Sequence, residues 1–171
     1  RDLRSVSNTS KKAQKLPSSF KATLRPYQSR GYEWLSKMTA CNFGACLADD
    51  MGLGKTVQVL AFLESLRQDA PDSKILLVVP ASLLGNWQNE CKKFAPLLPF
   101  QILHPSAFRH ADESSTVFLS ITTYSMVSRM EDLQQTDWDL VILDEAQAIK
   151  NPSSKQTKSI KSLKAKNRIA L

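Results

Sequence analysis

Short apolar runs alternate with longer amphipathic stretches along most of this 171-residue chain. Two of the runs, KILLVVP (74–80) and WDLVILDE (138–145), are almost continuously apolar, which indicates strands buried on both faces. The stretch KTVQVLAFLESLRQD (55–69) repeats apolar residues at helical spacing, which predicts a helix with one buried face. Further strands are predicted at 43–48, 100–105, 116–122 and 168–171, and further helices at 82–94, at 124–130 and in the Lys-rich segment that follows residue 145.

Strands that alternate with helices in this way predict an α/β fold, in which a mostly parallel sheet is covered by helices on both faces. Ser82 is a plausible cap for the helix at 82–94. Residues 1–19 are polar and basic and show no period, so they predict a flexible linker or tail. The length and the 42% hydrophobic content of the chain suit one domain, expected over residues 20–171.

The net charge of +7 lies at the two ends of the chain. Residues 1–23 carry +5 and residues 150–171 carry +7, whereas the middle carries −5. Near the C-terminus, lysines recur at a spacing that would form a basic stripe along a helix. Ile160 and Leu163 lie off this stripe and are expected to face the core. Such a stripe either binds phosphates or is simply solvated. The lysines recur at every third position, at Lys155, Lys158, Lys161 and Lys164.

Two features of the composition exclude other classes of protein. The longest apolar run near the middle, ILLVV, is far too short to span a bilayer, so no membrane partner is expected. Cys41, Cys46 and Cys91 lack the spacing of a metal or redox site, so they are expected to be reduced thiols packed as small hydrophobes.

The stretch LADDMGLGKTVQ places glycines between an apolar strand and a helix, which is the context of a phosphate-binding loop. Gly52 and Gly54 would let the backbone approach phosphates, and Lys55 would reach the β- and γ-phosphates. Thr56 would offer its hydroxyl to Mg²⁺. A chance turn before a core helix remains the alternative for this short motif alone.

The stretch LVILDEAQ supplies the second chemical signal. Asp144 and Glu145 follow an apolar strand, and ligands of open α/β sheets bind at the carboxyl ends of strands. Asp144 would hold Mg²⁺, partly through water, and Glu145 would orient and polarise the attacking water. Upstream, Gln28 in LRPYQSRGYEWL carries an amide that matches an adenine edge; read alone, the same residues are only a helix start.

These motifs, together with LLVVPASLLGNWQNECKKF, SITTYSMV and the closing RIAL, resemble in order the first helicase motifs of the Swi/Snf family of superfamily-two ATPases. The resemblance implies a RecA-like P-loop NTPase fold, cut off within the first motor lobe. It implies ATP and Mg²⁺ as cofactors, duplex DNA as a weak and non-specific partner, and a second RecA-like lobe elsewhere in the full-length chain. Family members translocate on duplex DNA and remodel protein–DNA complexes.

The resemblance also implies roles for single residues. Gln28 would read adenine, and Gln147 would link the nucleotide state to the partner lobe. The segments that contain Ser82 and Thr123 resemble motifs that contact a DNA strand, although both can equally be structural. The loop that would bind the triphosphate comprises Asp49, Asp50, Met51, Gly52, Leu53, Gly54, Lys55 and Thr56.

The chain departs from the family at its end. The family continues beyond RIAL and adds a second lobe that bears an arginine finger, so this chain is expected to be a monomeric piece that hydrolyses ATP poorly. The full-length protein is expected inside the cell, in the cytoplasm or nucleoid of a bacterium or the nucleus of a eukaryote. The alternatives are a non-catalytic adaptor with a nucleotide-binding fold, or another P-loop NTPase such as a kinase or GTPase.

Overall fold

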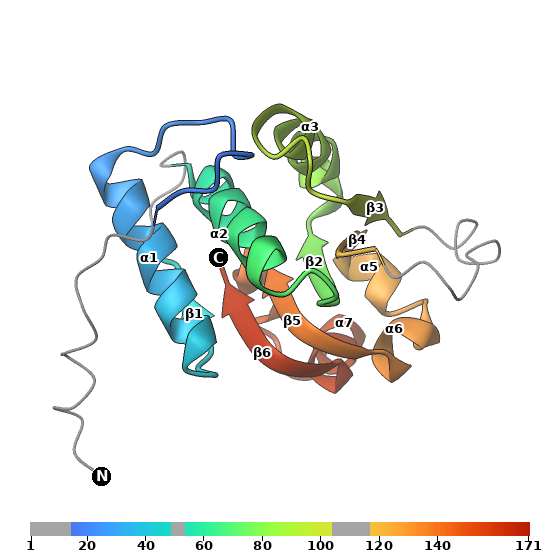
Figure 1. Ribbon diagram of the computed structural model, residues 1–171. Helices are drawn as coiled ribbons and strands as arrows, with labels where there is room; N and C mark the ends of the chain where they lie inside the picture. The colour runs from blue at the N-terminus through green and yellow to red at the C-terminus, as the bar shows by residue number, and fades with distance from the viewer. Residues whose placement is uncertain (1–14, 49–53, 104–116) are drawn as a thin grey trace, which may run out of the picture.

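The computed structural model describes residues 15–48, 54–103 and 117–171. In that part of the chain, six strands form one sheet in the order β1-β6-β5-β2-β4-β3 (Figure 1). Every neighbouring pair is parallel, as the alternation of strands and helices predicts. The strands are β1 (Ala45–Cys46), β2 (Ile75–Val79), β3 (Phe100–Ile102), β4 (Leu119–Thr123), β5 (Asp137–Leu143) and β6 (Lys164–Ala170).

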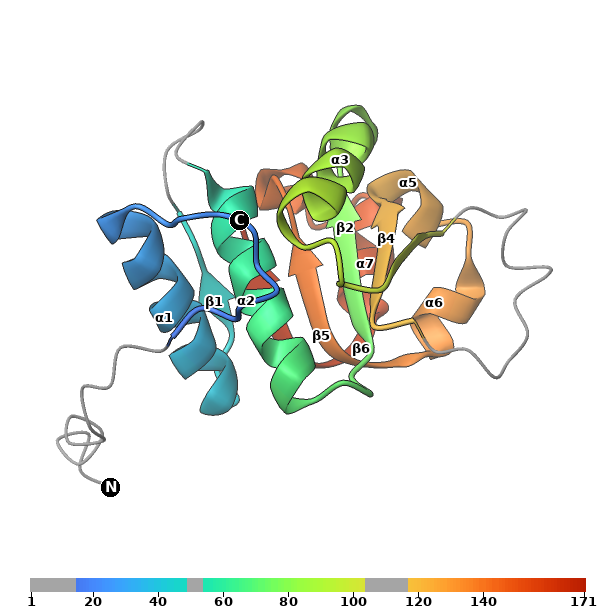
Figure 2. The ribbon, with the colours of Figure 1, turned by 45° about the horizontal axis from the view of Figure 1, so that its top comes forward.

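Helices cover both faces of the sheet, so the predicted α/β fold class is confirmed. Helices α1, α2 and α3 lie on one face, and α5, α6 and α7 lie on the other (Figure 2). None of the described helices combines the length and the apolar character that crossing a bilayer requires. The helices are α1 (Pro26–Ala40), α2 (Lys55–Asp69), α3 (Leu84–Phe94), α5 (Tyr124–Val127), α6 (Glu131–Gln135) and α7 (Lys155–Ser162), with 3-10 turns η2 (Ala81–Leu83) and η3 (Ala146–Ile149).

Strand β2 shows how the two cores form. Its residues are all buried, as the unbroken apolar run predicts. Because successive side chains point to opposite faces of a strand, Ile75, Leu77 and Val79 join the core beneath α2. Leu76 and Val78 join a second core beneath α5 and α7.

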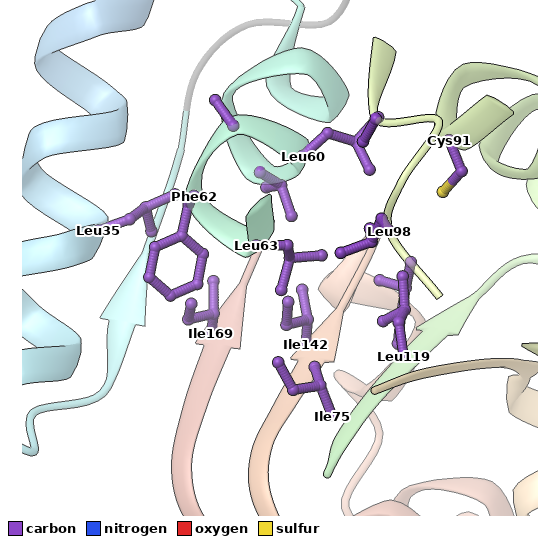
Figure 3. Close-up of a cluster of buried hydrophobic side chains, with 14 of the residues drawn as sticks. Leu35, Leu60, Phe62, Leu63, Ile75, Cys91, Leu98, Leu119, Ile142 and Ile169 are labelled. Carbon is purple, nitrogen blue, oxygen red and sulfur yellow. The ribbon is translucent and has the colours of Figure 1, made fainter. Parts of the chain in front are cut away.

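Helix α2 is buried on more than one side. Residues 58–65 are all buried, although the sequence pattern predicts a helix with a single buried face. The predicted face is buried, and α2 is buried beyond that face because it lies on the sheet between α1 and α3, which cover its flanks. Figure 3 shows Leu63 of α2 above Ile142 of β5 and Phe62 above Ile169 of β6. The helix is thereby fixed in position, and its N-terminus with it.

Buried Glu64 of α2 anchors the segment that precedes α1. Its carboxylate accepts hydrogen bonds from the hydroxyl of Ser19 and from the guanidinium of Arg67, the latter at 2.6 Å. Leu16 packs against the core, and the Lys21 backbone N–H donates to the Phe94 carbonyl at 2.7 Å. Within the expected linker, residues 15–19 therefore lie against the domain.

The predicted elements differ from the structure at several places. The predicted helix at 82–94 begins at Leu84, after a 3-10 turn, and no side chain caps it; Ser82 is exposed on that turn, not a cap. Strand β6 begins at Lys164, so that lysine lies outside helix α7 and the basic stripe is shorter than predicted. The five-residue helix α6 was not predicted.

The cysteines divide into two groups. All three thiols are free, but Cys41 and Cys46 are exposed, so the prediction of packing inside the protein is wrong for both. They lie at or near β1, which is only two residues long and stands at the edge of the sheet. Cys91 is fully buried on α3, and burial raises the pKa of its thiol to about 12.

Candidate functional site

A cavity of about 290 Å³ opens between the N-terminus of α2 and the residues that follow β5. It lies at the carboxyl end of a parallel strand, where open α/β sheets bind ligands. The cavity brings the predicted loop residues and the predicted acidic pair together, although they are some ninety residues apart in sequence. Its lining residues are Gly54, Lys55, Thr56, Val57, Leu83, Asn86, Trp87, Glu90, Asp144 and Glu145.

Gly54 turns the chain into α2. It has φ +77° and ψ 41°, a left-handed conformation that glycine adopts at little cost, and α2 begins at the next residue. The first N–H groups of a helix have no partner within it, so they can bind an anion together with Lys55. The other predicted residues of this loop, 49–53, lie outside the described residues.

Gln28 lies against Gly54 and does not line the cavity. A Cβ atom added at Gly54 would come within 2.4 Å of Nε2 of Gln28. The Oε1 atom of Gln28 accepts a hydrogen bond of 2.9 Å from the backbone N–H of Arg25, at the start of α1. The predicted adenine-reading residue is thus brought to the Gly54 turn from a different helix.

Asp144 is buried and receives a hydrogen bond on each carboxylate oxygen. The backbone N–H of Glu145 donates to Oδ1 at 3.0 Å. The indole Nε1–H of Trp87 donates to Oδ2 at 2.7 Å. Trp87 itself is buried, with an exposure of 1%. Its bond to Asp144 was not predicted, although a buried Trp usually finds a partner for its N–H.

Tyr124 holds the backbone of the same residue. Its hydroxyl donates to the carbonyl oxygen of Asp144 at 2.6 Å. Burial raises the pKa of Tyr124, and the charges of Asp144 and Glu145 raise it further, so the hydroxyl stays protonated and remains a donor. Trp87 belongs to the core on the α2 face and Tyr124 to the core on the α7 face. Asp144 is therefore held from both faces of the sheet.

Glu145 sits in a strained conformation beside the cavity. Its φ of 50° and ψ of 52° are left-handed, which costs a residue other than glycine roughly 1–3 kcal/mol. Its side chain is partly exposed and accepts a hydrogen bond from the amide of Gln147, which is itself exposed. The backbone thus turns sharply after β5 and leaves this carboxylate at the cavity wall.

The residues predicted to contact DNA lie outside the cavity and do not form one cluster with it. Ser82 is exposed. Thr123 is buried, and its hydroxyl is hydrogen-bonded to that of Ser125 at 3.1 Å. Ile160 and Leu163 are buried as predicted. The lysines of α7, Lys155, Lys158 and Lys161, are exposed on the face of the sheet opposite α2.

The parallel sheet, the glycine turn that leads into a Lys-Thr helix start, and the acidic pair at the end of β5 define a RecA-like P-loop fold. The chain belongs to the SNF2-related family, because the model of the SNF2-related domain matches residues 27–171. The resemblance seen in the motifs is confirmed, and the small P-loop kinase and the GTPase are set aside.

Individual relatives agree with the family match. The chain is 40% identical over 185 residues to YwqA of Bacillus subtilis (strain 168), covering 100% of this chain and 20% of YwqA. It is 39% identical over 173 residues to the chromatin-remodeling ATPase INO80 of Candida albicans, covering 91% of this chain and 12% of that protein. The chain therefore spans a fifth or less of the length of these relatives.

A solved structure supports the fold. The Sulfolobus solfataricus SWI2/SNF2 ATPase core in complex with dsDNA is 42% identical, with a TM-score of 0.84. The similarity covers 91% of this chain and 33% of that chain. The RecA-like fold predicted from the motifs is thereby confirmed.

Proposed function

We propose that this chain is the N-terminal ATP-binding lobe of a DNA-dependent ATPase that translocates on duplex DNA and remodels protein–DNA complexes. One observation carries the proposal: Lys55 and Thr56 at the start of α2 line the same cavity as Asp144 and Glu145. A cation and a helix N-terminus face an acidic pair there, which is the arrangement that phosphoryl transfer needs. Membership of the SNF2-related family supports the choice of ATP and DNA.

Each side chain of the site has a proposed task. Lys55 and the free N–H groups of α2 neutralise the β- and γ-phosphates. Glu145 orients a water molecule and accepts its proton. Gln28 reads the adenine edge across the Gly54 turn, and exposed Gln147, hydrogen-bonded to Glu145, transmits the nucleotide state to a partner lobe.

Mg²⁺ fits the donor atoms that the site offers. Thr56 and Asp144 would hold the ion, which would neutralise charge on the phosphates and supply a Lewis acid. The hydroxyl and carboxylate oxygens at the cavity are the hard ligands that Mg²⁺ prefers. The described residues contain no group of three or more His, Cys, Asp or Glu side chains suited to a metal ion. This agrees with an ion held by one or two protein groups, phosphate and water.

The partners of the site follow from the same proposal. A second RecA-like lobe would supply the arginine finger and close the cavity, and the isolated chain would be a monomer. The exposed lysines of α7, together with Ser82 and the segment around Thr123, would contact DNA without base specificity. The full-length protein would act on DNA inside the cell, in the nucleoid or the nucleus.

Replacing Lys55 with Ala is expected to weaken binding of Mg²⁺–ATP to this chain by about 10- to 100-fold. That range corresponds to one charge-assisted hydrogen bond, worth about 1.5–3 kcal/mol. Isothermal calorimetry with a non-hydrolysable ATP analogue measures it. Lys92→Ala is the matched control, because it removes the same charge from an exposed position of α3 that does not line the cavity. Equal affinity of the wild type and Lys55→Ala would remove Lys55 from the site.

A further inference from the structure

We infer that Trp87 is a positioning residue for Asp144, and that its indole N–H sets how well Mg²⁺ joins the nucleotide in this site. The inference rests on the proposed function for the role of Mg²⁺. The hydrogen bond of 2.7 Å between Nε1 of Trp87 and Oδ2 of Asp144 carries it. Both side chains are buried, at 1% and 7% exposure, and both line the cavity.

The donors that hydrogen-bond to the carboxylate of Asp144 are neutral N–H groups. The ion pairs found among the described residues join Arg67 to Glu64 and Lys166 to Asp139, so neither involves Asp144. A buried carboxylate without hydrogen bonds is costly, and here the indole and the backbone N–H of Glu145 supply one bond to each oxygen. Loss of the indole N–H would leave Oδ2 with no donor among these contacts.

The two hydrogen bonds also fix the direction of the carboxylate. Each oxygen of an ionised Asp can accept about two hydrogen bonds or metal contacts, so each keeps one lone pair after these bonds are made. With Tyr124 holding the carbonyl of the same residue, Asp144 is held at the backbone and at both carboxylate oxygens. Partners of this kind orient a metal ligand, and their removal typically weakens metal affinity by roughly 10–100-fold.

Trp138, in the strand β5 that Asp144 directly follows, provides a matched control. It is buried at 6% exposure, and its Nε1–H donates to the carbonyl oxygen of Leu133 at 2.9 Å. It does not line the cavity. Trp87→Phe and Trp138→Phe therefore remove the same group from a buried hydrogen bond, but only the first touches the site.

The test titrates Mg²⁺ into the 171-residue chain with a fluorescent ATP analogue. In Trp87→Phe, the Mg²⁺ concentration for half-maximal strengthening of nucleotide binding should rise roughly 10–100-fold. Affinity for the analogue without Mg²⁺ should stay near the wild-type value, and Trp138→Phe should match the wild type throughout. An unchanged Mg²⁺ dependence in Trp87→Phe, or equal changes in both variants, would overturn the inference.

A second readout does not depend on nucleotide or on how Trp87→Phe folds. In a ¹⁵N spectrum, Asp144→Asn should shift the indole N–H resonance of Trp87 and leave that of Trp138 in place. An unshifted Trp87 resonance would refute the contact. If the wild type shows this contact but Mg²⁺ does not strengthen its nucleotide binding, the proposed function fails. If Mg²⁺ strengthens binding equally in the wild type and in Trp87→Phe, only the inference about Trp87 fails.

Discussion

Replacing Glu145 with Gln is expected to lower ATP hydrolysis about 10²- to 10⁴-fold in a protein that carries this chain together with the proposed second lobe. The range is that of a general base lost from its position. Gln has nearly the same shape but cannot accept the proton of the attacking water, so Mg²⁺–ATP binding should remain close to the wild-type value. Glu145 also lies in a strained backbone conformation at the cavity wall, where strain is commonly retained for function.

Steady-state hydrolysis and calorimetric binding, measured on the same preparations, check this expectation. Glu131→Gln is the control, because Glu131 is exposed at the start of α6 and does not line the cavity. A Glu145→Gln variant that hydrolyses ATP at the wild-type rate would assign the water-activating role to a different residue.

Replacing Gly54 with Ala is expected to lower the free energy of unfolding by roughly 2–4 kcal/mol, from a strained backbone and an overpacked contact. The residue has φ +77°, and the new Cβ would meet Nε2 of Gln28 at 2.4 Å. The amide of Gln28 would have to shift, and its Oε1 atom accepts a hydrogen bond from the Arg25 backbone N–H. The phosphate-loop turn would be distorted, so affinity for Mg²⁺–ATP should fall as well.

Urea unfolding followed by circular dichroism measures the change in stability. Gly85→Ala is the control, because a Cβ at Gly85 in α3 has no heavy atom within 4 Å. Alanine is a better helix former than glycine by roughly 0.5–1 kcal/mol, so Gly85→Ala should be neutral or stabilising. Equal stability of Gly54→Ala and the wild type would show that the turn tolerates a side chain and that glycine is not required at this position.

Much of the fold could be predicted because the sequence signals are local and strong. The helix predicted at 55–69 has the same bounds as α2, since the glycine turn and the apolar repeat both mark it. Strands β2 and β5 were predicted from unbroken apolar runs, which a sheet covered on both faces requires. The pairing of the loop with the acidic residues at 144–145 followed from the rule that ligands bind at the carboxyl ends of strands.

The features of the fold and site that could not be predicted depend on tertiary contacts, which no local sequence pattern encodes. The first turn after β2 is 3-10 and not α-helical, so Ser82 has no helix to cap. Lys164 follows the lysine spacing but lies in β6, because that strand pairs with β5 from Asp137 onward. The donors from Trp87 and Tyr124 to Asp144 join residues 57 and 20 positions apart. Sequence spacing alone could not show that they meet.

Hydrolysis of ATP, measured with and without duplex DNA, tests the central proposal most directly. We expect the 171-residue chain alone to turn over very slowly, because the arginine finger that we propose for a second lobe would contribute about 10³–10⁵ in rate. A protein that carries both lobes should hydrolyse ATP faster by that factor, and only when duplex DNA is present. Rapid turnover by the isolated chain that Glu145→Gln abolishes, or turnover by the longer protein that duplex DNA leaves unchanged, would contradict the assignment to a DNA-dependent motor.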